Sequence, residues 1–238
     1  MFGKSLATAV FVSTVLGVSA SNASSVDVTY QVSGTSFGNE GLRERVTIST
    51  PNDPTFAEGG LYDGSTSAGE FQLQGGQTLG EFAAFCVELA QSLQSAASYE
   101  FAPDLFGGRI LANVDRLFSS AYSQIDTSIE AAAFQVALWE IVHDDASSFD
   151  LSAGNVLISG NDDVVDQASV YLSGLDTAAT GLFDISFLQS DSSQDLVIAT
   201  LRTESIEGPP PVPLPASSLL LLGGIGGLVA MRRKRSRR

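Results

Sequence analysis

The chain has 238 residues, with 27 acidic and 12 basic side chains and a formal net charge of −15 at neutral pH. All of the acidic residues lie within residues 24–208, where the only basic side chains are five arginines. A domain of this charge is repelled by nucleic acid and by anionic lipid surfaces, so nucleic acid is excluded as a partner. We interpret the acidity as a surface property rather than as a site for a particular cation.

The first residues have the pattern of a secretory signal peptide. A lysine precedes an apolar run that is too short to span a membrane, and small residues follow it up to Ala23. We predict a signal peptide over residues 1–23, cut after Ala23, with Ala20 as the alternative position. Residues 24–208 then suit one extracytoplasmic domain with a sizeable core.

Alternating apolar and polar residues predict strands in the first part of this domain. We expect the segments 26–34 and 41–50 to pair antiparallel, and we interpret the turn-rich segment 51–69 as a long loop. Further strands are predicted over residues 70–76, 85–89 and 98–103.

Apolar residues at helical spacing predict three helices in the middle of the domain. The first covers residues 108–123 and the third covers residues 162–173. The second is marked by Thr127 and Glu130, which fit a capping box, and it continues to about Val142.

The last part of the domain predicts a hairpin from residues 183–189 and 195–201. The order of strands, then helices, then strands predicts an α+β fold. We expect an antiparallel β-sandwich or barrel with a central helical insertion of two to three helices.

The second helix is almost wholly apolar, yet Gln135 lies at the centre of its apolar side. A buried amide without a partner costs about 1–3 kcal/mol, so a backbone group or another side chain must meet it. One candidate is Cys86, the single cysteine of the chain. Alternation along its strand places Cys86 and Glu88 on the face opposite Phe85.

Each of these residues also has a plainer interpretation. Cys86 cannot form an internal disulfide, and it is a buried inert thiol, an intermolecular link or a reactive group. Gln135 can be an ordinary hydrogen-bonded side chain and Trp139 a core aromatic. Glu88 and Glu140 are most simply solvated.

The chain lacks the usual motifs of enzymes: it has no GxSxG, no HExxH, no P-loop and no metal-ligand cluster. We therefore expect no enzyme, no cofactor and no metal site. A hydrolase that uses Cys86 with His143 has no third orienting residue in the sequence. Two acidic groups are candidates for binding Ca²⁺: Asp144–Asp145, and Asp162–Asp163 with Asp166. They lack the spacing of an EF-hand, and capping and loop roles are the favoured interpretation.

Residues 209–238 have a proline-rich stretch, an apolar segment that we predict to be a transmembrane helix, and a cluster of basic residues. The apolar segment is about 24 Å long as a helix, which is short of the roughly 30 Å hydrocarbon core. A permanent tail anchor is one interpretation. The other depends on a five-residue motif, Val212, Pro213, Leu214, Pro215 and Ala216.

This segment resembles the PEP-CTERM class of bacterial sorting signals in its VPLPA variant. The resemblance implies recognition by an exosortase and cleavage near the motif. It also implies the envelope or surface of a Gram-negative bacterium, at least transient membrane anchoring, and association with exopolysaccharide or biofilm.

The sequences FCVEL and FQVALWEIV resemble the thioester domains of bacterial surface proteins over about residues 82–175. The matching positions are Cys86, Gln135, Ala137, Leu138 and Trp139. Phe134 stands where the family usually has threonine. The resemblance implies a thioester between Cys86 and Gln135, supported by Ala137, Leu138 and Trp139.

We therefore expect a secreted, exosortase-sorted surface protein that attaches to extracellular polysaccharide or to a surface protein through this bond. The alternative is a non-covalent structural protein of the envelope or of an exopolysaccharide matrix, in which Cys86 and Gln135 only pack.

Overall fold

The structure is a computed structural model, and the residues that it describes are 25–32, 34–39, 41–50, 64–144 and 148–203. The chain divides into two units, Met1–Arg202 and Thr203–Arg238, and all helices and strands of the described residues belong to the first. The predicted signal peptide and the predicted sorting motif lie outside the described residues. Within the described residues, no helix is long and apolar enough to cross a membrane.

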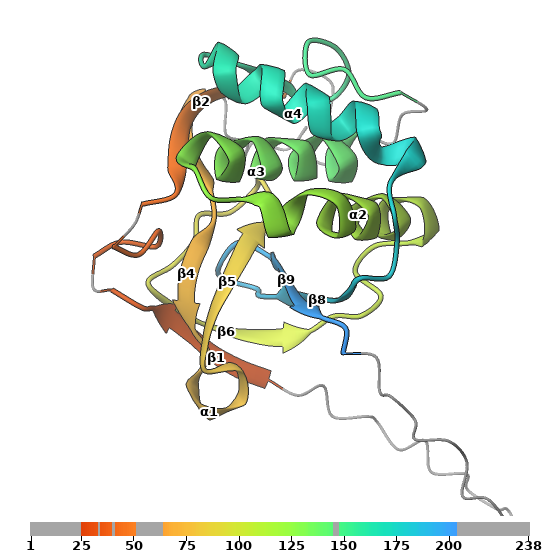
Figure 1. Ribbon diagram of the computed structural model, residues 1–238. Helices are drawn as coiled ribbons and strands as arrows, with labels where there is room; N and C mark the ends of the chain where they lie inside the picture. Colours follow the sequence, from red (N-terminus) through yellow and green to blue (C-terminus); the bar gives the residue numbers. More distant parts are fainter. Residues whose placement is uncertain (1–24, 33, 40, 51–63, 145–147, 204–238) are drawn as a thin grey trace, which may run out of the picture. The chain divides into compact units, whose positions relative to one another are not determined.

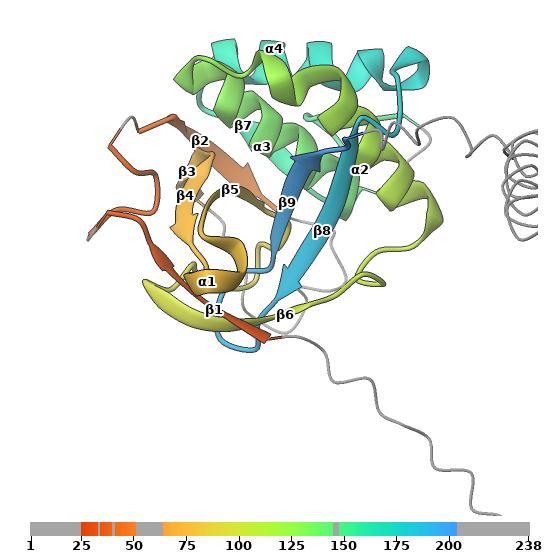
Figure 2. The same cartoon turned by 60° about the horizontal axis from the view of Figure 1, so that its bottom comes forward.

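Six antiparallel strands form a closed barrel (Figures 1 and 2). Around the barrel they are β1 (Ser25–Tyr30), β4 (Phe71–Gln74), β5 (Glu81–Cys86), β9 (Leu196–Leu201), β8 (Phe183–Gln189) and β6 (Ala96–Phe101). Pairing of β6 with both β1 and β8 closes the ring, so the predicted choice between sandwich and barrel is resolved in favour of the barrel. The predicted hairpin is β8 with β9.

A second sheet has three strands, with β2 (Arg43–Ser49) between β3 (Gly64–Gly69) and β7 (Leu157–Ser159). Two predictions were wrong here. The first two predicted strands do not pair, because β1 belongs to the barrel and β2 to this sheet. The predicted loop covered residues 51–69; its part 64–69 is β3, whose sequence GSTSAG has no apolar alternation and whose strand is set by its backbone pairing with β2. Residues 51–63 lie outside the described residues.

The helices α2 (Gly108–Ala121), α3 (Ser128–His143) and α4 (Asp162–Gly174) lie in sequence between β6 and β8, which confirms the predicted helical insertion and the α+β class. A further element, α1 (Gly76–Leu79), is a single turn. Figure 1 shows the three long helices on one side of the barrel, with α3 between α4 and the strands.

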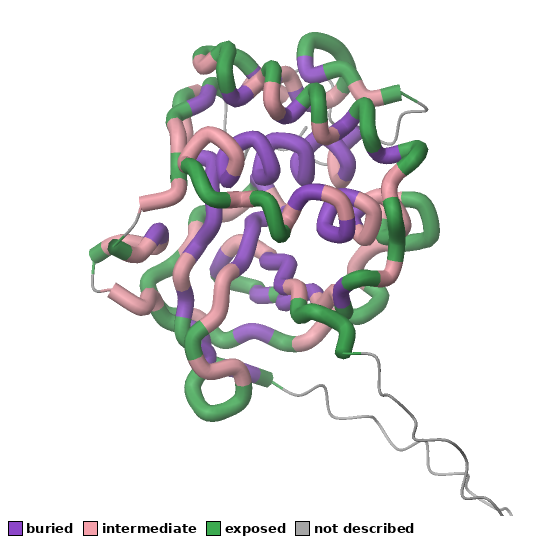
Figure 3. The backbone as a smooth tube through the Cα atoms, viewed as in Figure 1, coloured by how far each residue is buried: buried purple, intermediate pink, exposed green. Residues whose placement is uncertain are grey.

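Helix α3 is the centre of the packing. Its residues from Ala131 to Ile141 are all buried, and Figure 3 shows this helix as a continuous buried segment. A helix that is apolar on every side belongs inside a protein, and here the sheets and the neighbouring helices cover it. The predicted capping box is confirmed: the Thr127 side chain accepts from the Glu130 N–H and the Glu130 carboxylate accepts from the Thr127 N–H. The predicted solvation of Glu140 was wrong, since the side chain is buried.

Strand β5 separates two parts of the core. Phe85 and Val87 belong to the layer between the barrel and the helices, whereas Cys86 belongs to the cluster that includes the barrel interior. This is the alternation that the sequence predicted. The strand itself ends at Cys86, earlier than predicted.

Candidate functional site

Cys86 lies where β5 loses one of its two neighbouring strands. On one edge, Cys86 is opposite Leu196 of β9, and the next residue, Val87, donates its N–H to the Asp195 carbonyl at 2.9 Å. On the other edge, the pairing with β4 ends at Ala84. The N–H and C=O of Cys86 therefore need a partner that no strand supplies.

Gln135 of α3 supplies that partner. Its Oε1 accepts from the Cys86 N–H at 2.9 Å, and its Nε2 donates to the Cys86 carbonyl at 2.7 Å. The carboxamide thus takes the place of a neighbouring strand and satisfies two buried backbone groups at once. The sequence offered two kinds of partner for Gln135, a backbone group or Cys86. The structure shows that the partners are backbone groups and that they belong to Cys86.

The Cys86 thiol is buried beside the backbone of Glu88. The thiol donates to the Glu88 carbonyl, and the sulfur accepts from the Glu88 N–H at 3.3 Å. Burial raises the pKa of the thiol to about 12, although the Glu88 backbone and then the Trp139 side chain act in the opposite direction. At neutral pH the sulfur therefore carries its proton.

Two segments that follow β5 and β8 are bonded to each other close to the thiol. Glu88 accepts the Asp195 N–H at 3.1 Å. The segment after β8 is also bonded to β6, where the Tyr99 hydroxyl lies 2.7 Å from Ser193 Oγ and 3.0 Å from the Gln194 carbonyl. Burial raises the pKa of both Glu88 and Asp195. Glu88 is thus a partly buried residue that connects the two segments.

The three supporting residues of the predicted motif follow Gln135 within the next turn of α3. Ala137 and Leu138 are fully buried and Trp139 is 3% exposed. Among the described residues, no acceptor lies in hydrogen-bonding geometry to the buried indole Nε1–H of Trp139.

Phe134, the position before the glutamine, has a packing role. Its ring centroid lies 4.6 Å from that of Phe85, 4.9 Å from Phe118 and 5.8 Å from Tyr122. Because Phe85 directly precedes Cys86, this aromatic cluster fixes α3 against the end of β5. Phe134 is thus an apolar anchor at the contact between α3 and the end of β5.

Sequence reasoning missed a second polar group, at the end of α3. Glu140 is 1% exposed; its Oε1 accepts the Asp150 N–H at 2.8 Å. Asp144, also buried, accepts the N–H groups of Asn155 at 2.7 Å and Val156 at 3.3 Å. Two acids one turn apart at the end of so apolar a helix were the signal that could have revealed it. Asp145, the other half of the predicted acidic pair, lies outside the described residues.

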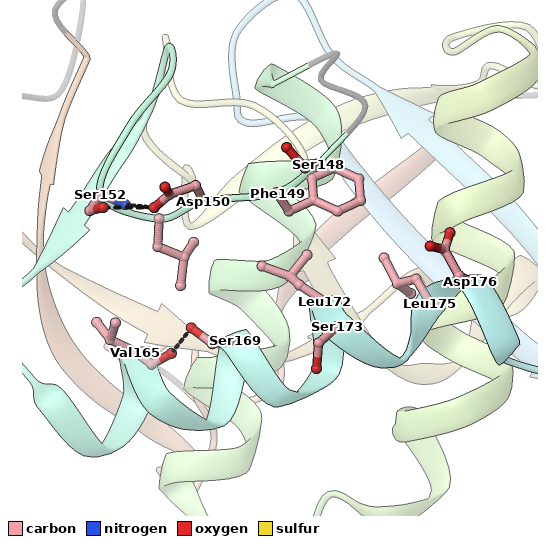
Figure 4. Close-up of a pocket in the computed structure, with 11 residues that line it drawn as sticks. Ser148, Phe149, Asp150, Ser152, Val165, Ser169, Leu172, Ser173, Leu175 and Asp176 are labelled. Carbon is pink, nitrogen blue, oxygen red and sulfur yellow. Dashed lines mark hydrogen bonds between the residues drawn. The ribbon is translucent and has the colours of Figure 1, made fainter.

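A groove of about 550 Å³ lies elsewhere, between the 148–152 segment and α4 (Figure 4). Leu172 and Leu175 form part of its wall, and Asp150 accepts from Ser152 at its edge. Neither Cys86 nor Gln135 contributes to it. In the part of the chain that the structure describes, no group of three or more His, Cys, Asp or Glu side chains could hold a metal ion.

No family model and no curated protein matches this sequence. Among solved structures, the chain is similar to the N-terminal thioester domain of a surface protein from Clostridium perfringens, with 12% identity and a TM-score of 0.37, over 67% of this chain and 100% of that chain. It is also similar to the N-terminal domain of the Streptococcus pyogenes pilus tip adhesin Cpa, with 16% identity and a TM-score of 0.38, over 66% and 93%. Similarity at this level carries no argument about the site.

Proposed function

We propose that this is a secreted surface protein whose extracytoplasmic domain attaches to its surroundings through a thioester between Cys86 Sγ and the side-chain carbonyl carbon of Gln135. One observation carries the proposal: two hydrogen bonds hold the Gln135 carboxamide against Cys86 in a fully buried position. The resemblance of the two short motifs to thioester domains supports it.

The bond forms when Cys86 Sγ attacks the carboxamide carbon and the carbon–nitrogen bond breaks. The thiol proton leaves with the nitrogen, so the products are the thioester and one ammonia. In the tetrahedral intermediate, negative charge develops on Gln135 Oε1, where the Cys86 N–H already donates at 2.9 Å. The Cys86 carbonyl orients the leaving nitrogen at 2.7 Å.

The surroundings suit a bond that must survive until a partner arrives. Cys86 and Gln135 are each 1% exposed, and Leu138 and Trp139 add apolar cover. Exclusion of water delays hydrolysis. An amine or hydroxyl group of polysaccharide or of a surface protein then attacks the acyl carbon, the carbon–sulfur bond breaks, and the sulfur regains a proton. The protein stays attached through Gln135, so this is a single event rather than enzyme turnover.

The C-terminal segment completes the proposal. The motif Val212, Pro213, Leu214, Pro215 and Ala216, with the apolar and basic residues after it, would be processed by an exosortase in a Gram-negative envelope. The domain would then be released to, or held at, the outer surface. Expression of the full chain with and without residues 209–238, followed by fractionation of the envelope, tests this part separately.

The intact mass of the purified domain tests the thioester. We expect the wild-type mass to be lower than the sequence mass by one ammonia, and we expect Cys86→Ala to abolish that difference. A wild-type protein of full mass with a titratable thiol would exclude the covalent function.

A second candidate is a non-covalent structural protein of the envelope or matrix. It is favoured by the observation that Gln135 already satisfies both backbone groups of Cys86, while burial keeps the thiol protonated. On this alternative, Cys86→Ala leaves surface attachment unchanged.

A further inference from the structure

The backbone leaves the regular pairing of β5 with β9 directly after Cys86. In a regular antiparallel ladder, the two residues of a hydrogen-bonded pair exchange both of their N–H···O bonds. Val87 makes one of these bonds, donating its N–H to the Asp195 carbonyl at 2.9 Å. The Asp195 N–H donates instead to the side-chain carboxylate of Glu88, at 3.1 Å. A side chain has therefore taken the place of a strand carbonyl at this edge.

This departure brings the backbone of Glu88 to the Cys86 sulfur. The thiol donates to the Glu88 carbonyl, and the Glu88 N–H donates to the sulfur at 3.3 Å. In a regular strand the backbone groups point sideways to the neighbouring strands, whereas the side chains stand on the two faces. The contact with the sulfur thus depends on the turn at Glu88, and the Glu88 carboxylate fastens that turn to Asp195.

We propose that the Glu88 N–H is the donor that stabilises negative charge on Cys86 Sγ as the thioester to Gln135 forms and breaks, and that the Glu88 carboxylate is the positioning group that holds this N–H in place. The inference rests on the proposed function. A hydrogen bond to a charged acceptor is about twice as strong as one to a neutral acceptor. A donor that is already in place needs little reorganisation when the charge develops.

The site would then hold a separate backbone donor for each atom that gains charge. The Cys86 N–H donates to Gln135 Oε1 at 2.9 Å, and the Glu88 N–H faces the sulfur at 3.3 Å. When an amine attacks the thioester, the new carbon–nitrogen bond forms and the electron pair of the carbon–sulfur bond passes to Sγ. The proton that the amine nitrogen gives up then neutralises the sulfur, and the thiol can donate again to the Glu88 carbonyl.

The test compares two uncharged replacements of Glu88 that have similar size. Glu88→Gln keeps an oxygen that can accept the Asp195 N–H, whereas Glu88→Met has no such oxygen. Both proteins are treated with methylamine, and the gain in mass is followed with time. We expect Glu88→Met to react about tenfold more slowly than Glu88→Gln, from the usual strength of a hydrogen bond to a charged group. Equal rates in the two variants would overturn the proposal.

Two further variants serve as controls for this comparison. Glu81→Met makes the same change at an exposed acid at the start of β5, and it should react at the wild-type rate. Glu88→Ala also removes the acceptor but adds no bulky apolar group, so the comparison with Glu88→Gln stands even if Glu88→Met does not fold. We expect Glu88→Ala to be slow as well.

A second measurement separates this proposal from the function on which it rests. After methylamine treatment Cys86 carries a free thiol whether or not a thioester was present, and its alkylation by iodoacetamide is timed at one fixed pH. We expect slower alkylation in Glu88→Met than in Glu88→Gln, because less of the thiol is ionised once its donor is displaced. A merely structural role predicts the opposite order, since a loosened turn exposes the sulfur.

The two measurements together distinguish the possible failures. Slower alkylation in Glu88→Met with a wild-type protein of full mass would retain the role of Glu88 toward the sulfur and exclude the thioester. Equal or faster alkylation in Glu88→Met would exclude the role of Glu88, whatever the mass of the wild-type protein.

Discussion

Gln135 and Glu140 interrupt the same buried helix, and each is 1% exposed. Both atoms of the Gln135 carboxamide are paired with the backbone of Cys86. Only one oxygen of Glu140 is paired, with the Asp150 N–H, while Oε2 has no hydrogen-bond partner among the described residues. The two residues therefore solve the problem of a buried polar group in different ways.

The difference shows what a neutral group and an acid each require. A carboxamide can both donate and accept, so it can replace a neighbouring strand at the end of β5 without any change of charge. A carboxylate can only accept, and burial followed by the nearby charge of Asp144 raises the pKa of Glu140 to about 7, although the Asp150 N–H lowers it. Glu140 therefore meets burial by keeping its proton up to about pH 7.

The largest expected effect on stability comes from removing the two hydrogen bonds between Gln135 and the Cys86 backbone. Gln135→Met keeps the volume and leaves the N–H and C=O of Cys86 buried without partners. We expect the free energy of unfolding to fall by about 2–4 kcal/mol. The substitution is best made in Cys86→Ala, which removes any covalent contribution, and compared with that single variant by urea denaturation. A loss below about 0.5 kcal/mol would show that the two hydrogen bonds contribute little.

The raised pKa of Glu140 predicts that the free energy of unfolding depends on pH. The unfolded chain has an ordinary glutamate pKa of about 4.3, so between that pH and about 7 the folded state binds a proton that the unfolded state has released. The stabilisation is complete below about pH 4.3 and is lost as the pH rises to about 7. Glu140→Gln removes this titration, so its stability relative to wild type should rise by about 1–2 kcal/mol between about pH 5 and pH 8. Thermal unfolding of both proteins across that range measures the difference, and parallel curves would contradict it.

The smallest effect is expected at the exposed start of the same helix. Thr127→Ala removes the two hydrogen bonds of the Thr127 hydroxyl, one accepted from the Glu130 N–H and one donated to the Glu130 carboxylate, both at a position open to solvent. We expect a loss of about 1 kcal/mol, the same at about pH 5 and pH 8. Ser173→Ala, whose hydroxyl only donates to its own helix at the Val170 carbonyl, is a suitable control with little effect.

Local patterns were enough for much of this protein. The capping box located the start of α3, helical spacing located α2 and α4, and alternation located the hairpin of β8 and β9 and the opposite facing of Phe85 and Cys86. These features depend on residues a few positions apart, whose preferences act within one element. The uncharged Gln135 in an apolar helix likewise indicated, from the sequence alone, that its amide must have a partner.

Only the tertiary structure decided which partners those elements have. The closure of the barrel, the place of β2 and β3 in a separate sheet, and the end of β4 short of Cys86 depend on contacts between distant segments. The same is true of the burial of Glu140 and the partial burial of Glu88, whose hydrogen-bond partners come from segments distant in the sequence. The sequence by itself determined that a buried amide and a single thiol had to be accommodated. The packing of α3 against the open edge of β5 decided that they meet, because only there are two backbone groups of Cys86 left without a strand.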